Sequence, residues 1–400
     1  MFNEEKYKNT TKKLEVIFKR TEDDLLTSWQ ISDFISQLTK HYYKNELLNT
    51  ISLALKHGIS PKNIIIFNES FDIDYTNKNM GLLDLTTSAD VKFFYSRLDA
   101  LSMFPDEEIT KIRLIFSYFR GINELLYQYH FSRLDKNNLI RYYNKIKKGL
   151  PYKEIINEIE SLALEIVKET ANVTDKEKER FRRDTKELTS NTISSFLAFE
   201  KDKPSLDILI ERIEDNDSNV FKDSTYQKLE RDYFKGFFTK FNSLQRPIIG
   251  IYSSENRKVQ ILCDSFINKT KHDPSKFLDL KSISHNSPYE AIFHIGLTIV
   301  IPLITILSVS LNSRNLLEES DTTEKEREEA EARIERTIRE LEPATESEEI
   351  KAVEEIPQDY IRNKMLENYD QNTQNFVEPV KKYGFANHRI EVRVFDTSSK

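Results

Sequence analysis

Apolar residues recur at a helical period near the N-terminus of this chain. Between Ser28 and Leu55 they follow one another at intervals of three or four residues, and Gly58 and Pro61 come directly afterwards. This spacing predicts an amphipathic helix, and glycine followed by proline is a typical helix end. We therefore expect residues 1 to about 60 to be helical, with Ser28 as a helix cap.

Strand patterns come next, followed by a long helical stretch. Asn63–Phe67 is a continuous apolar run and Phe71–Tyr75 alternates, so we predict two strands. From about Ser88 to Ala198 only helical patterns occur. One helix is predicted to start at Asp106-Glu107-Glu108, where acidic residues suit the helix dipole. Its apolar face consists of Ile109, Ile112, Ile115, Phe116 and Phe119.

Helical patterns continue over residues 205–241, and the period changes to that of strands after Pro247. Ile248–Tyr252 and Lys258–Cys263 are joined by the turn-forming sequence S-S-E-N-R, and Leu278–Ile283 is a third candidate strand. These runs predict a small antiparallel β unit.

The most hydrophobic segment of the chain is Ala291–Leu311. Its 21 residues, AIFHIGLTIVIPLITILSVSL, contain no Asp, Glu, Lys or Arg. A helix of this length spans about 31 Å, close to the thickness of the hydrocarbon core of a bilayer. On such a helix the polar residues fall within an arc of about 120°. We predict that this arc lines a pore or an interface, and its members are His294, Thr298, Pro302, Thr305, Ser308 and the flanking Asn312.

Three interpretations of this segment stay open. It can be a buried core helix, a single-pass anchor packed against a partner, or a self-associating helix whose polar arc faces other copies or a water-filled lumen. Lysines precede the segment and a strongly acidic run, Glu318 to Glu355, follows it. This charge bias predicts that the N-terminal side lies in the cytoplasm. In the tail, Glu324–Leu341 is a predicted charged helix and His388–Phe395 a strand that adds to a sheet elsewhere.

Composition and motifs argue against common catalytic classes. The chain has only 8 glycines, one cysteine and a net charge of −7, so disulfides within the chain and multi-cysteine zinc sites are excluded. Glycine-rich nucleotide loops, nucleophile elbows and HExxH-type zinc motifs are missing. Asp72 and Asp74 can share one face of a strand, but the Gly-Ser helix start of nucleotidyltransferases is missing upstream, and Cys263 has no adjacent base. We expect no catalytic residue, metal or cofactor, although a divergent enzyme stays open.

Two basic clusters are candidates for binding an anionic ligand such as a nucleotide. The first has helical spacing and consists of Arg141, Lys145 and Lys148; the second consists of Arg180, Arg182, Arg183 and Lys186. The alternative for both clusters is a solvated helix face.

The stretch Ser282–Gly296 reads S-I-S-H-N-S-P-Y-E-A-I-F-H-I-G. Ser287 suits an N-cap, Pro288 the first helical position and Glu290 the third position of a capping box. The stretch resembles a recurring element of bacterial proteins, in which a strand and I-S-x-N-S-P-x-E precede a hydrophobic helix. Some proteins with this layout resemble membrane-acting effectors of antiphage defence. The resemblance implies a soluble sensing body and transmembrane helices that oligomerise and permeabilise the membrane.

We therefore predict a mainly α fold with small β elements (α+β). Its predicted regions are 1–84 (helix plus strands), 85–245 (α-helical domain), 246–288 (small β unit), 289–312 (membrane helix) and 313–400 (acidic helical tail with a C-terminal strand). The leading hypothesis is a bacterial inner-membrane effector that forms homo-oligomers and responds to a nucleotide or oligonucleotide made by a partner enzyme. The alternative is a soluble scaffold or adaptor that buries residues 291–311 in a protein–protein interface.

Overall fold

The protein consists of two compact units, and one is inserted into the other. The computed structural model describes residues 12–19, 26–70, 81–96, 100–170, 173–217, 219–262, 279–284, 290–296, 352–383 and 391–396. Unit 1 comprises residues 1–59, 72–80 and 262–400, and unit 2 comprises residues 60–71 and 81–261. The described residues are mostly helical with antiparallel sheets, which confirms the α+β class. The five consecutive regions expected from the sequence do not correspond to the two compact units, because segments far apart in sequence pair with each other in unit 1.

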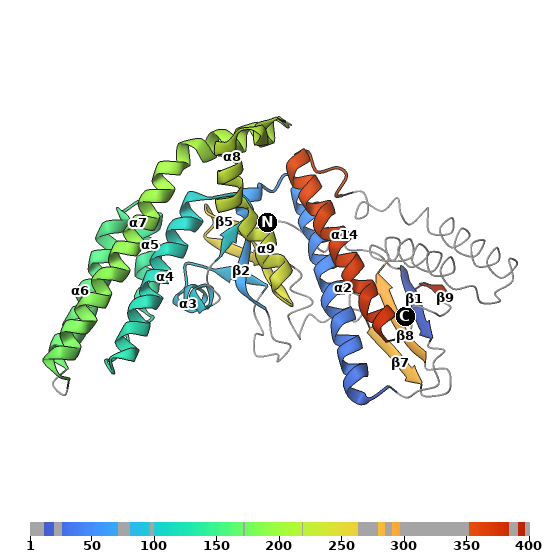
Figure 1. The fold of residues 1–400 in the computed structure, drawn as a ribbon, viewed down its shortest axis with the longest axis horizontal. Coiled ribbons are helices and arrows are strands. Elements are labelled where there is room, and N and C mark those ends of the chain that lie inside the picture. Colours follow the sequence, from blue (N-terminus) through green and yellow to red (C-terminus); the bar gives the residue numbers. More distant parts are fainter. Residues whose placement is uncertain are drawn as a thin grey trace, which may run out of the picture. The chain divides into compact units, whose positions relative to one another are not determined.

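Two long helices, α2 (Ser28–Lys56) and α14 (Asp359–Lys382), lie side by side in unit 1 (Figure 1). They run antiparallel, since Asp33 pairs with Lys382 at 3.0 Å near one end and Lys56 pairs with Glu355 at 2.6 Å near the other. The helix predicted here is confirmed, and it ends at His57 and Gly58 as expected.

The cap of α2 is Thr27 and not Ser28. Thr27 has extended backbone, its side chain accepts a hydrogen bond from the Gln30 amide at 3.3 Å, and the Gln30 side chain accepts one from the Thr27 amide at 2.8 Å. Ser28 is already the first helical residue, so the capping box belongs to the residue before it.

Polar side chains are buried where α2 meets α14. His41 Nδ1 lies 2.7 Å from Asn372 Oδ1, and the Asn372 amide donates to the His41 carbonyl at 2.7 Å and to Asn45 Oδ1 at 2.5 Å. Burial lowers the pKa of His41 to about 4, so the ring is neutral at neutral pH. Because a buried amide needs its partners, this network favours one register of the two helices over shifted ones.

Four strands form the sheet of unit 1 in the order β7-β8-β1-β9, each pair antiparallel. Their bounds are β1 Lys12–Lys19, β7 Asp279–Ser284, β8 Glu290–Gly296 and β9 Glu391–Asp396. Strand β1 contradicts the helix expected over the first 60 residues, and it pairs with two strands from the C-terminal part. The strand predicted near the C-terminus is confirmed as β9, which adds to this sheet.

The helix expected from residue 291 does not begin there. Residues 290–296 form β8, which pairs with β1 on one side and β7 on the other. Glu290 therefore begins a strand and is not part of a helical capping box. Residues 297–311, like the predicted tail helix 324–341, lie outside the described residues. Where the chain is described, no helix combines the length and apolar character needed to cross a membrane.

The sheet of unit 2 has the order β3-β6-β5-β2-β4 and is antiparallel throughout. Its strands are β2 Ile64–Ser70, β3 Leu82–Asp84, β4 Leu101–Ser102, β5 Pro247–Ser253 and β6 Lys258–Ile261. The predictions for β2, β5 and β6 are confirmed, whereas residues 71–75 lie outside the described part. The third strand predicted after Pro247 exists as β7, but it belongs to the sheet of unit 1. The prediction of one small β unit over residues 246–288 is therefore wrong, because its strands belong to two different sheets.

Helices make up the rest of unit 2, and the predicted helical character is confirmed. They are α3 Ser88–Ser96, α4 Glu107–Gln128, α5 Asn138–Lys147, α6 Tyr152–Glu169, α7 Asp175–Glu214, α8 Ser224–Leu229 and α9 Lys235–Ser243, with a π-helical turn at Glu230–Phe234. The five apolar residues predicted for one face of α4 are all buried. Helix α7 has 40 residues and contains Pro204, and Figure 1 shows it bending in its last third.

Candidate functional site

The three acidic residues at the start of α4 point to three different partners. Asp106 caps the helix, since its Oδ1 accepts a hydrogen bond from the Ile109 amide at 2.8 Å. Burial raises the pKa of Asp106 despite this bond. Glu107 pairs with Lys203 of α7 at 2.9 Å. The acidic start predicted from the helix dipole therefore also joins α4 to other parts of unit 2.

Glu108, the third of these acids, is the centre of a polar network. Lys147 Nζ at the end of α5 donates to its two carboxylate oxygens at 2.8 and 2.9 Å, and Ser254 Oγ donates to it at 2.7 Å. Tyr252 of β5 also donates to Glu108 through its hydroxyl, which lies 3.3 Å from that of Tyr143. Burial alone would raise the pKa of Glu108, but the bonds from Lys147, Tyr252 and Ser254 outweigh it and lower the pKa.

This network has the residue types of a serine–lysine site but not the charge state. Lys147 Nζ lies 2.6 Å from Ser254 Oγ, a distance suited to proton transfer. A lysine that acts as a base must be neutral, whereas Lys147 donates to both oxygens of an ionised carboxylate. Burial, together with the Tyr143 and Glu108 contacts, raises the pKa of Tyr252, which therefore stays protonated. We conclude that the network holds α4, α5 and the β5–β6 hairpin together.

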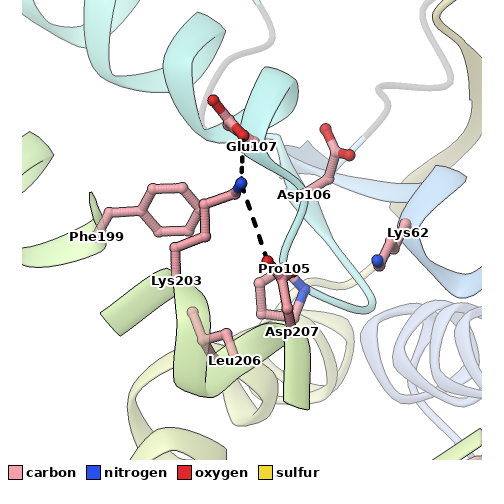
Figure 2. Close-up of a pocket in the computed structure, with 8 residues that line it drawn as sticks. All are labelled: Lys62, Pro105, Asp106, Glu107, Phe199, Lys203, Leu206 and Asp207. Atoms are coloured by element: carbon pink, nitrogen blue, oxygen red, sulfur yellow. Dashed lines mark ion pairs between the residues drawn. The ribbon is translucent and has the colours of Figure 1, made fainter. Parts of the chain in front are cut away.

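A shallow cleft of about 220 Å³ lies where α4 begins and α7 passes (Figure 2). Figure 2 shows Lys203 reaching from α7 to Glu107, at 2.9 Å, and to Asp207, at 3.9 Å. The remaining lining residues are Lys62, Pro105, Asp106, Phe199 and Leu206. Carboxylates of the same chain already pair with Lys203, the cation of this cleft. The Lys203–Glu107 pair therefore joins α7 to α4, and the cleft does not offer a prepared anion site.

The first predicted basic cluster lies where α5 faces α6. Arg141 and Lys145 both pair with Glu158 of α6, while Lys148 is exposed beyond the end of α5. One carboxylate thus partly neutralises two of the three cations. Binding of an anionic ligand here stays a prediction, and such a ligand would have to compete with Glu158.

The second predicted basic cluster is on the N-terminal part of α7. Its members, Arg180, Arg182, Arg183 and Lys186, are all exposed. Arg183 pairs with the adjacent Asp184 at 3.0 Å, and Asp184 also accepts a hydrogen bond from Tyr129 at 2.6 Å. Glu179 and Glu187, both exposed, flank these cations, so residues 179–187 have a net charge of only +1 (4 − 3).

The predicted pore- or interface-lining residues are not brought together by the described structure. His294 lies in strand β8, opposite Glu15 of β1 and Asp279 of β7 in the strand registers, so the helical arc does not include it. Thr298, Pro302, Thr305, Ser308 and Asn312 lie outside the described residues. The same is true of Asp72, Asp74 and Cys263.

One surface that the predictions missed is the outer face of α7, which we define as Ser190, Ser194, Leu197, Lys201, Pro204 and Ile208. At 100° per residue these positions fall within about 80° of one another. All six are exposed, and Leu197 and Ile208 are each 49 % exposed. Phe196, Phe199, Leu209 and Ile213 are buried on the opposite side. The signal in the sequence is the stretch 188–199, which has no Asp, Glu, Lys or Arg in a chain that is 31 % charged.

No protein-family model, curated protein or solved structure matches this chain.

Proposed function

We propose that this chain is a scaffold or adaptor that binds another protein chain through the outer face of α7. The observation that carries the proposal is the exposure of all six residues of this face, two of them large and apolar. Single exposed apolar residues are common on protein surfaces. This face carries one charged residue, Lys201, among its six positions, and the stretch 188–199 of α7 carries none. Depletion of charge is typical of interface cores.

The support of α7 suits this role. Its buried side packs against α4 and α6, and Phe196 stacks on Tyr152 with ring centroids 4.0 Å apart. Phe181 contacts Phe131 in an edge-to-face arrangement at 5.5 Å. A helix held in this way along its length loses little conformational freedom on binding, which favours association.

Cysteine protection in cells tests the proposal. The background variant Cys263→Ser removes the native thiol. Ser194→Cys then reports on the outer face, and Ser132→Cys, also exposed, is the matched control outside it. We expect a maleimide to label Ser194→Cys more slowly in intact cells than in the dilute purified chain, and to label Ser132→Cys with the same relative rate in both. Equal protection ratios at the two positions would reject the proposal.

A second candidate is the membrane-acting effector, with the membrane, further copies of the chain and a nucleotide or oligonucleotide signal as partners. It is supported by residues 297–311, which contain no Asp, Glu, Lys or Arg. With residues 290–296 in a strand, a helix over these 15 residues would span about 22 Å, less than the roughly 30 Å of a hydrocarbon core. This shortfall makes the membrane effector the weaker of the two proposals.

Membrane extraction separates the second candidate from the first. An integral protein stays in the membrane pellet in alkaline carbonate and is released by detergent. If the effector proposal holds, Thr298→Leu or Thr305→Leu should abolish ion leakage without changing the carbonate-resistant fraction. Release of the full chain by carbonate would reject membrane insertion, and unchanged leakage in both variants would reject a pore lined by these residues.

A further inference from the structure

We draw no further inference here: the strongest candidate, the outer face of α7, carries nothing beyond the proposed function, because residues 179–187 beside it have a net charge of only +1 (4 − 3) and nothing in the structure shows what covers the face.

Discussion

Replacing Glu108 by leucine removes the carboxylate that accepts hydrogen bonds from Lys147, Tyr252 and Ser254, and we expect it to destabilise unit 2. The Lys147 side chain is only 11 % exposed, so its ammonium would keep the Ser254 hydroxyl and carbonyl as its acceptors among the described residues. Removing one partner of a fully buried ion pair costs about 3–5 kcal/mol. Because 24 % of the Glu108 side chain is exposed, water can reach the site, and we expect about 2–3 kcal/mol.

The matched controls are Lys147→Met and the double variant Glu108→Leu/Lys147→Met. The double variant replaces both charges with apolar groups of similar size, so we expect it to cost about 1 kcal/mol or less. Because the double variant then costs less than Glu108→Leu alone, the coupling energy between the two positions in a double-mutant cycle is at least about 1 kcal/mol. Hydrogen exchange of the full chain, followed in peptides that cover β5, is the suitable assay because two units are not expected to unfold in a single two-state step. The reasoning is refuted if Glu108→Leu alone leaves the protection of β5 unchanged, or if the double variant costs as much as that single variant.

The same carboxylate predicts a pH dependence with a definite sign. Its hydrogen bonds hold the pKa of Glu108 below the ordinary value of 4.5, so the folded state binds its proton less readily than the unfolded chain. The stability that it contributes is complete above that ordinary value and is lost as the pH falls through the lower folded value. The difference in β5 protection between wild type and Glu108→Leu should therefore shrink under acidic conditions. A difference that grows below pH 4.5 would contradict the assignment.

Two further predictions concern buried positions. Burial lowers the pKa of His41 from 6.5 to about 4, so the unfolded chain binds more protons than the folded chain between these pH values. We therefore expect α2 to lose up to about 3 kcal/mol of stability as the pH falls from 6.5 to 4. Hydrogen-exchange protection of α2 should depend less on pH in His41→Gln than in wild type, and an equal pH dependence would contradict this prediction. Gly250→Ala should destabilise unit 2 by about 1–3 kcal/mol, because the added Cβ would lie 2.7 Å from Val259 Cγ1 in the neighbouring strand. Gly121→Ala is the control: the atoms nearest to its Cβ belong to the end of the Leu188 side chain, which can change rotamer, so thermal unfolding should show little loss or a small gain. Equal losses in the two glycine variants would contradict the packing argument.

The helices of unit 2 were predictable because their evidence is local. Each apolar residue predicted for α4 is buried, since a period of 3.6 residues identifies the inward face without knowledge of the partner. The same holds for the end of α2 at Gly58, where φ is +82° and glycine is favoured.

The contacts of the candidate sites were not predictable in this way because their partners are distant in sequence. Glu108 was assigned to the dipole of its own helix, but Lys147 lies 39 residues away and Tyr252 144 residues away. Likewise, Arg141 and Lys145 have the spacing of an anion site, and only the packing of α5 on α6 reveals Glu158 between them. The outer face of α7 has a signal in the sequence, because residues 188–199 carry no charge within an otherwise charged helix. The sequence alone does not show that this face is exposed, since that depends on which side of α7 packs against other helices.

The hydrophobic segment shows why apolar character alone does not distinguish a helix from a strand. A short continuous apolar run is compatible with a buried strand and with a segment of a buried helix, and periodicity alone does not distinguish the two. Residues 291–296 satisfy a helical arc and a strand equally well. The choice is made by β1, a segment about 280 residues earlier whose backbone pairs with β8 from Lys13 to Lys19. Because β1 was itself expected to be helical, both halves of the pairing were missed together. When one strand of a pair is predicted to be a helix, its partner strand is easily predicted to be a helix as well. A membrane helix proposed from composition therefore needs evidence that no segment elsewhere in the chain pairs with it as a strand.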